Sequence, residues 1–267
     1  ELGADYIFVL DRPMLGKEFV SEVNDLQLPI IWIDHHDMDE EKENYDNVFV
    51  YNPTRNKTKS AEPTTYLCYS ATKRKEDMWV AMIGSIADNF LPEFTEEFVK
   101  SYPEYWVKNI KKPFDAYYGT RIGRLLRALS FGLKDSITHV VQLQNFMISA
   151  KNPSDVDAEL ESTRAFAVKY KEIFSKYSAL LEEAKKCAEK KMVFFNYGGT
   201  LSISSDLSNE LKYIYPDKYI AVAYSSGPIT NISLRGANVK KILLEIIKDF
   251  ENATGGGHSM AVGSRIQ

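Results

Sequence analysis

The most informative stretch of the sequence is residues 30–36, which read Ile30-Ile31-Trp32-Ile33-Asp34-His35-His36. An unbroken apolar run that ends in charged and imidazole side chains is typical of a strand in a parallel sheet. The earlier run Tyr6 to Leu10 has the same character, and we expect it to be buried on both faces; it ends at Asp11. Helical spacing over 15–26 joins the two runs. This succession predicts the βαβ unit of an α/β fold.

The remainder of the chain predicts two further regions. A third strand covers 48–51 and stops at Asn52-Pro53, and helices follow over 64–74 and 77–87, the second ending just before Asp88. Residues 157–190 lack Gly and Pro and have apolar residues near helical spacing, which indicates a long helix. After Lys191, strands are expected at 192–195, 219–224 and 230–234, with helices at 206–214 and 239–250. We therefore predict an α/β domain with a parallel sheet over 1–155, a connecting helix over 156–191 and a smaller α+β domain over 192–267.

Composition and charge narrow the class of protein. The chain has 267 residues, enough for one large domain or two domains of ordinary size. Its net charge is −4, so the protein as a whole has no positive electrostatic field that would attract nucleic acid or another polyanion. No run approaches the roughly 18 apolar residues of a membrane span, and the start carries no signal pattern. Only Cys68 and Cys187 occur, without metal-type spacing. We expect a soluble, cytoplasmic protein with no membrane partner.

Histidines and carboxylates gather at the predicted strand ends. Because the carboxyl ends of parallel strands share one edge of a sheet, Asp11 and the Asp34-His35-His36 cluster should meet there, joined by Asp88. Carboxylate and imidazole ligands suit manganese, zinc or iron better than calcium. Two such ions about 3.5–4 Å apart would activate water for phosphoryl transfer. The alternative is that each Asp caps a helix or turn and that the His pair is a polar strand end.

The C-terminal region offers a second candidate site. Free N–H groups in a loop at Gly255-Gly256-Gly257-His258 could hold an anion, and Ser233 and Arg235 could add polar contacts to a phosphodiester. A glycine-rich helix stop is the alternative for the glycines. Arg235 could equally form a surface ion pair.

Residues 100–134 are locally basic. They contain eight Lys or Arg residues against two acidic ones, an excess of +6, with seven aromatic residues interleaved. Basic and aromatic residues occur together where a protein binds the phosphates of single-stranded nucleic acid and stacks on its bases. A solvent-exposed helix face over an aromatic core fits the same composition equally well. Arg55 and Lys57, with Lys59, lie nearer the metal edge and are candidates for substrate contact.

Five motifs occur in an order that resembles one family. They are Ile33-Asp34-His35-His36, Asn52-Pro53, Gly84-Ser85-Ile86-Ala87-Asp88, Ser233-Leu234-Arg235 and Gly255-Gly256-Gly257-His258. In this order and spacing they resemble the DHH/DHHA1 phosphoesterases over nearly the whole chain. The long middle region looks more like the RecJ-like single-strand exonucleases of archaeal type than the compact phosphatases.

The resemblance implies an activity and residue roles. It implies a manganese-dependent phosphodiesterase, with Mg²⁺ as an alternative cofactor, that hydrolyses single-stranded DNA or RNA from an end. Asp11 would bridge two Mn²⁺ ions, His35 and Asp88 would be further ligands, Asp34 would orient the site, and His36 would face the scissile phosphate. The substrate would be held by Ser233, Arg235, Gly256, Gly257 and His258.

One departure from the family pattern sets up rival hypotheses. The family carries an Asp-x-Asp motif on a strand upstream of the Asp11 strand, and residues 1–10 do not provide it. We therefore expect the chain as written to be inactive or nearly so, either as a fragment, which we favour, or as a degenerate relative. A phosphoesterase for nano-RNA, pAp or a cyclic dinucleotide is one rival. A non-catalytic replication scaffold that binds GINS or another replication protein is the other.

Overall fold

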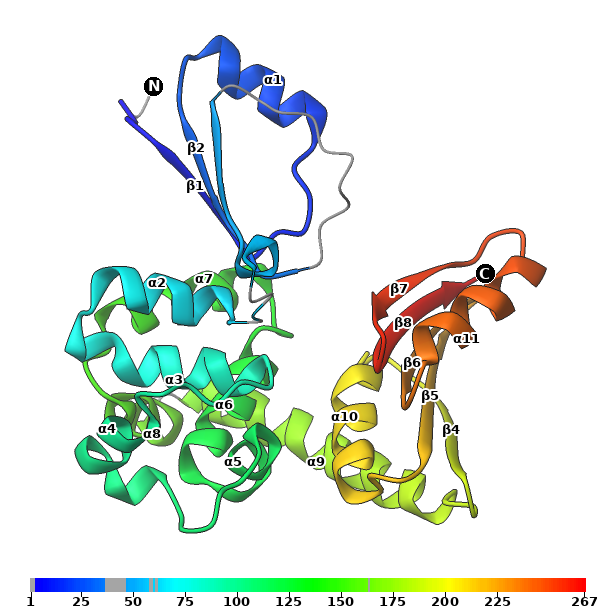
Figure 1. Cartoon of the computed structure of the whole chain (residues 1–267). Helices are drawn as coiled ribbons and strands as arrows, with labels where there is room; N and C mark the ends of the chain where they lie inside the picture. The colour runs from blue at the N-terminus through cyan, green and yellow to red at the C-terminus, as the bar shows by residue number, and fades with distance from the viewer. Residues whose placement is uncertain (1–2, 37–46, 58–59, 61, 163) are drawn as a thin grey trace. The chain divides into compact units, whose positions relative to one another are not determined.

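The computed structural model describes residues 3–36, 47–57, 60, 62–162 and 164–267 (Figure 1). The chain forms two compact units, Glu1–Glu161 (unit 1) and Ser162–Gln267 (unit 2), and each is described by itself. In the described part of the chain, no helix is both long and apolar enough to cross a membrane.

Unit 1 begins with a three-stranded parallel sheet. Strands β1 (Ile7–Leu10), β2 (Ile30–Ile33) and β3 (Val48–Tyr51) pair in the order β1-β2-β3, and helix α1 (Lys17–Asp25) connects the first two. One face of the sheet packs against α1, where Val20 and Val23 contact Ile30 and Trp32 in a small core. The predicted parallel arrangement of these three strands is confirmed.

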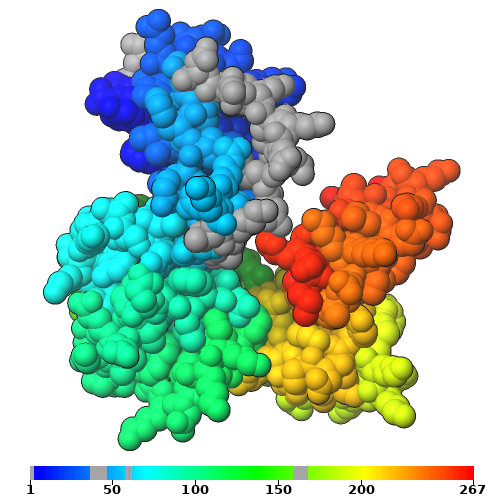
Figure 2. Space-filling view, viewed as in Figure 1, coloured from blue at the N-terminus to red at the C-terminus, as the bar shows by residue number. Residues whose placement is uncertain are grey.

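The prediction that the first strand is buried on both faces is wrong. The strand register places Phe8 beside Ile31 and Phe49, and Leu10 beside Ile33 and Tyr51, on the face opposite α1. On this second face, Phe8 is 61% exposed and Leu10 46% exposed. We expected both faces to be covered because an apolar strand in a parallel sheet usually has cover on both sides. Among the described residues, α1 packs on one face, and Phe8 and Leu10 on the other face stay exposed. β1 is also an edge strand, visible in dark blue in Figure 2.

Helices make up the remainder of unit 1. They are α2 (Thr64–Thr72), α3 (Met78–Ala87), α4 (Thr95–Ser101), α5 (Pro113–Gly119), α6 (Arg121–Gly132), α7 (Ile137–Ser149) and α8 (Pro153–Ser162). Large side chains from α3, α4 and α6 are fully buried, among them Trp79, Phe98 and Phe131. Most of the stretch expected to be one helix over 157–190 is helical, as part of α8 and as α9 (Arg164–Lys186), and residue 163 between them lies outside the described residues.

The basic stretch of residues 100–134 is partly built into this helical core. Asp157 is 5% exposed and accepts hydrogen bonds from Tyr105 Oη at 2.9 Å and Arg121 Nε at 2.8 Å. Arg124 pairs with the same carboxylate. Burial and the Asp157 carboxylate raise the pKa of Tyr105, so the phenol stays a donor. For these residues the geometry favours a structural network over a surface for nucleic acid.

Unit 2 contains a mixed five-stranded sheet in the order β4-β5-β6-β8-β7. Its strands are β4 (Met192–Gly198), β5 (Tyr219–Ser226), β6 (Ile229–Arg235), β7 (Thr254–His258) and β8 (Ala261–Ile266), and its helices are α9, α10 (Ser204–Ile214) and α11 (Val239–Ile246). β4 and β5 are parallel, and the other pairs are antiparallel. The glycine stretch expected to be a loop is instead the edge strand β7, because its backbone pairs with β8 along five residues.

Candidate metal centre

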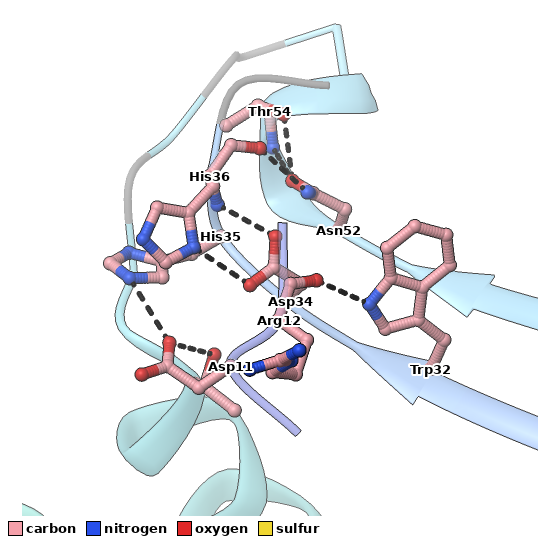
Figure 3. A network of polar contacts seen from close by, with 9 residues as sticks. Asp11, Arg12, Trp32, Asp34, His35, His36, Asn52 and Thr54 are labelled. Carbon is pink, nitrogen blue, oxygen red and sulfur yellow. Dashed lines mark hydrogen bonds and ion pairs between the residues drawn. The ribbon is translucent and has the colours of Figure 1, made fainter. Parts of the chain in front are cut away.

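The turn after β1 holds Asp11 beside the end of β2. Asp11 has a φ of 56°, in the left-handed region that Asp tolerates better than most residues. Its backbone N–H donates to the carbonyl of Ile33 at 3.0 Å, and Trp32 Nε1 donates to the carbonyl of Arg12 at 2.8 Å. These two bonds attach the turn to β2 and place the Asp11 carboxylate at the carboxyl edge of the sheet (Figure 3).

Asp34 fixes the position of His36. It is fully buried, and its carboxylate accepts from the backbone N–H of His36 at 3.1 Å and lies 2.9 Å from His36 Nδ1. A carboxylate at this distance favours the tautomer that carries the proton on Nδ1. His36 therefore presents Nε2 as the nitrogen with a lone pair for a cation or a substrate.

Asp11, His35 and His36 form a group that could hold a metal ion. One ligand atom from each residue lies within 4.8 Å of the others. His35 Nε2 is 3.4 Å from Asp11 Oδ1, and the His35 side chain is 13% exposed while that of Asp11 is 54% exposed. A carboxylate with two imidazoles fits Mn²⁺, Zn²⁺ or Fe²⁺ by donor type. The sequence had placed these residues at one edge, and the structure brings them together.

Two supporting residues of the centre were not assigned roles from the sequence. Asn52 Nδ2 donates to the carbonyl of His36 at 3.0 Å, while Asn52 Oδ1 accepts from the backbone N–H of Thr54 at 2.9 Å (Figure 3). Thr64, at the start of α2, donates from Oγ1 to Asp11 Oδ1 at 3.1 Å. The sequence pointed to Asn52, because Asn52-Pro53 ends the predicted third strand. Nothing in the sequence near Thr64 pointed to its role, because its partner Asp11 lies 53 residues away.

The other residues predicted for this edge lie in different settings. Asp88 follows α3, where its backbone N–H donates to the carbonyl of Gly84 at 3.1 Å, and it does not belong to the metal-binding group found among the described residues. Its role as a ligand stays a prediction. Arg55, the last residue of the 3₁₀ turn Pro53–Arg55, and Lys57 are exposed next to Asn52. Lys59 lies outside the described residues.

In unit 2, the register of β6, β8 and β7 gathers the predicted substrate residues. Ala261 pairs with Arg235 on one side and His258 on the other, and Gly263 pairs with Ser233 and Gly256 in the same way. Gly257 lies between these rows on β7, with a φ of 131° that favours glycine. The five residues therefore share one region of a single sheet.

The side chains of this region have structural partners. Ser233 is 4% exposed, and its hydroxyl lies 3.1 Å from Ser204 Oγ and 3.2 Å from Ser205 Oγ. Arg235 donates from Nε to Asn209 Oδ1 at 2.7 Å and from a terminal nitrogen to the carbonyl of Val262 at 3.2 Å. These bonds fix the guanidinium against the sheet. Its contact with a substrate stays a prediction.

Comparison with solved structures identifies the fold. RecJ from Thermus thermophilus, in complex with Mn²⁺, superposes with a TM-score of 0.65 over 99% of this chain at 14% identity. The chain shares the fold of RecJ. An exonuclease RecJ bound to manganese gives a TM-score of 0.57 at 14% identity, over 99% of this chain and 71% of the other. No protein-family model and no curated protein sequence matches the chain.

The chain is shorter than these relatives. It spans 42% of the length of the Mn²⁺-bound Thermus RecJ and 44% of the same protein in complex with Mg²⁺, with which it shares 12% identity and a TM-score of 0.53. At these identities the comparison establishes the fold, and substrate and partners are matters for proposal.

Proposed function

We propose that this chain is a manganese-dependent phosphodiesterase of the RecJ-like type, which hydrolyses single-stranded DNA or RNA from an end. The observation that carries the proposal is the meeting of Asp11, His35 and His36 ligand atoms within 4.8 Å. The group lies at the carboxyl edge of a parallel sheet, where α/β folds bind ligands. Solved relatives with this fold hold Mn²⁺ or Mg²⁺.

The residues of the centre have distinct roles in this proposal. Asp11 and His35 hold the cation, with Asp88 as a further ligand, and Asp34 keeps His36 directed at the scissile phosphate. A bound Mn²⁺ or Mg²⁺ supplies a nucleophilic water at neutral pH and offsets charge on the phosphoryl oxygens. Asn52 holds the backbone of His36 in place through its 3.0 Å hydrogen bond.

The ligand set limits the expected activity of residues 1–267. Two ions would need more carboxylates than Asp11 and Asp88 provide, and the resemblance assigns further ligands to an Asp-x-Asp motif that residues 1–10 do not contain. We therefore expect these residues to bind one Mn²⁺ weakly and to hydrolyse substrate slowly.

Each unit by itself carries residues that we propose to contact substrate. In unit 2 these are Ser233, Arg235, Gly256, Gly257 and His258, and in unit 1 they are Arg55 and Lys57.

One observation favours a second candidate, a phosphoesterase for short substrates such as nano-RNA, pAp or a cyclic dinucleotide. Arg121 and Arg124 share the single carboxylate of Asp157, which offsets one of their two positive charges and engages both guanidinium groups within the protein.

Mn²⁺ binding and hydrolysis test the proposal together. Titration calorimetry with Mn²⁺ should give one site, which Asp11→Ala and His35→Ala abolish while the far-UV circular dichroism is kept. Asp25→Ala, an exposed carboxylate at the end of α1, is the matched control and should bind as the unmodified chain does. If Asp11→Ala binds and cleaves normally, the metal assignment is wrong. If the chain is instead a non-catalytic scaffold that binds GINS, neither the unmodified chain nor any of these variants should show Mn²⁺-dependent cleavage.

Substrate length separates the two enzymes. Cleavage rates on labelled single strands of 2 to 30 nucleotides should rise with length for the exonuclease and fall for the short-substrate enzyme. Arg235→Ala should raise KM with little change in kcat if the guanidinium contacts substrate. An unchanged KM would remove Arg235 from the site.

A further inference from the structure

One face of the unit 2 sheet is covered only in part. Helix α11 packs on this face over β6 and β8, because Leu243 lies in one cluster with Leu234 and Val262. The strand register continues the face from Leu234 to Ala221 on β5 and from there to Phe194 on β4. Phe194 is 56% exposed. The face is therefore open to solvent at β4, an edge strand of the sheet (Figure 1).

Two aromatic rings and a methionine lie in the open part. Met192 and Tyr219 pair in the register two residues before Phe194, so all three side chains share this face. Met192 is exposed, and Tyr219 is 42% exposed. The Tyr219 ring lies against Gly236, where a Cβ atom would come within 2.5 Å of the ring. A close contact with the backbone therefore holds this ring at the surface.

A pair of lysines precedes β4. The backbone N–H of Glu189 donates to the carbonyl of Met192 at 2.9 Å, which closes a short turn that contains Lys190 and Lys191. The carbonyl of Lys191 accepts from the backbone N–H of Tyr219 at 3.0 Å. Both lysines are exposed, and the turn therefore places them next to the first residues of the open face.

A second pair of lysines begins α11. Lys240 and Lys241 are exposed in the first turn of this helix, just beyond Gly236. Glu245, the acidic residue of α11, pairs with Lys248 at 2.8 Å in the last part of the helix. The start of α11 therefore adds two further positive charges near the open face.

Positive charge predominates around the open face. The segments 189–191, 217–219 and 236–241 hold five lysines and two acidic residues, an excess of +3, whereas the whole chain has a net charge of −4. A local excess of this kind attracts anions even when the protein as a whole does not. We call these three segments, together with Met192 and Phe194, the β4–β5 surface.

The β4–β5 surface continues the row of residues proposed to contact substrate in unit 2. Arg235 pairs on one side with Ala261, the partner of His258. On its other side it pairs with Ile220, which is next to Tyr219. Because β4 lies two strands from β6, at about 4.8 Å per strand, the surface begins within about 10 Å of Arg235. A polymer held at Arg235 can therefore reach the surface.

Single-stranded nucleic acid has the chemistry that this surface requires. Proteins that bind it without sequence preference combine a positively charged path for the phosphates with aromatic side chains on which the bases stack. A second copy of this chain would bring the same positive charge to both sides of the contact, which opposes association. Continuity with Arg235 favours nucleic acid over an anionic lipid surface.

We propose that the β4–β5 surface binds single-stranded DNA or RNA beyond the nucleotides held at Arg235. Bases stack on Phe194 and Tyr219, and the lysines contact the phosphates. The inference deepens the proposed function and rests on it for the class of substrate. It places contacts with a polymer on unit 2, whereas two arginines of residues 100–134 are engaged by Asp157.

Oligonucleotide binding without metal tests the inference. In EDTA, fluorescence anisotropy of a labelled oligothymidylate of about 12 nucleotides should give a Kd for the 267-residue chain that rises with salt concentration. Phe194→Ala should raise this Kd by about 5- to 150-fold, the range of one base–aromatic stack. Phe250→Ala, which truncates another exposed ring of unit 2, should leave the Kd unchanged.

Lysine variants keep the test valid if Phe194→Ala does not fold. Lys190→Gln combined with Lys191→Gln changes only exposed side chains of a turn. The slope of log K against log salt should become shallower by about 1.4, since each phosphate contact of a single strand contributes about 0.7. Lys171→Gln combined with Lys176→Gln removes the same charge from exposed sites on α9 and should keep the slope. An unchanged slope in the first double variant would overturn the inference.

The outcomes also separate the inference from the proposed function. Mn²⁺-dependent hydrolysis, with oligonucleotide binding that none of the variants weakens, would leave the phosphodiesterase standing and remove this surface. Weaker binding by the Phe194 and lysine variants, without hydrolysis by the unmodified chain, would do the reverse. If the surface binds phosphatidylserine vesicles or a second copy of the chain and not the oligonucleotide, the inference is overturned.

Discussion

Thr64→Val isolates the hydrogen bond that orients Asp11. Valine has nearly the shape of threonine, so the substitution removes the Oγ1 donor at 3.1 Å from Asp11 Oδ1 without opening a cavity. Thr64 is 4% exposed, so water does not take the place of the hydroxyl at the same point. The free energy of unfolding should fall by about 1 kcal/mol, because the shape of the side chain is kept and one hydrogen bond is lost.

The effect on metal affinity follows from the exposure of Asp11. A hydrogen bond to a charged acceptor contributes about 1.5–3 kcal/mol when both groups are buried. The Asp11 side chain is 54% exposed, so solvent recovers part of this loss and about 1 kcal/mol remains. This corresponds to a roughly fivefold higher Kd for Mn²⁺.

Calorimetric titration with Mn²⁺ at constant pH measures the effect. Thr64→Ser keeps the hydroxyl and should restore the affinity of the unmodified chain. A purely structural role for Thr64 predicts parallel changes in stability and affinity. If Thr64→Val binds Mn²⁺ with an unchanged Kd, the orientation of Asp11 does not depend on this bond, and the reasoning is refuted.

Two further predictions concern stability. Asp157→Asn should lower the free energy of unfolding of unit 1 by about 1–3 kcal/mol, since the negative charge and one of the two acceptor oxygens shared by the buried Tyr105 hydroxyl and two half-exposed guanidinium groups are lost; an equal urea midpoint for both proteins would contradict this. Burial raises the pKa of Tyr197 to about 12, above its value of about 10 in the unfolded chain. Its stabilising contribution is therefore complete below pH 10 and is lost as the pH rises toward 12. Between about pH 9 and pH 11 the unmodified chain should lose about 1 kcal/mol more than Tyr197→Phe, and identical pH profiles would show that Tyr197 does not couple to folding.

Local pattern was enough to predict that Asp11 and the Asp34-His35-His36 cluster lie at one edge of the sheet. Residues 30–36 and the run that ends at Asp11 carry the strand signal and the ligands in the same few residues. Parallel pairing then brings the carboxyl ends of adjacent strands to one edge, where Asp11, His35 and His36 meet, whereas Asp88 does not belong to this group. The three strands of unit 1 and the main strands and helices of unit 2 follow from their periodicity in the same way.

Contacts distant in sequence were decided only by tertiary structure. The bond of Thr64 to Asp11 and the pairing of Arg124 with Asp157 depend on how helices pack, which a residue's neighbours in sequence do not encode. Exposure of Phe8 likewise depends on which elements cover a sheet face, since an apolar strand reads the same whether one face or both are covered. The sequence by itself determined the periodicity and chemistry of each element, and tertiary packing decided which side chains gained partners, because burial and pairing arise from segments far apart in the chain.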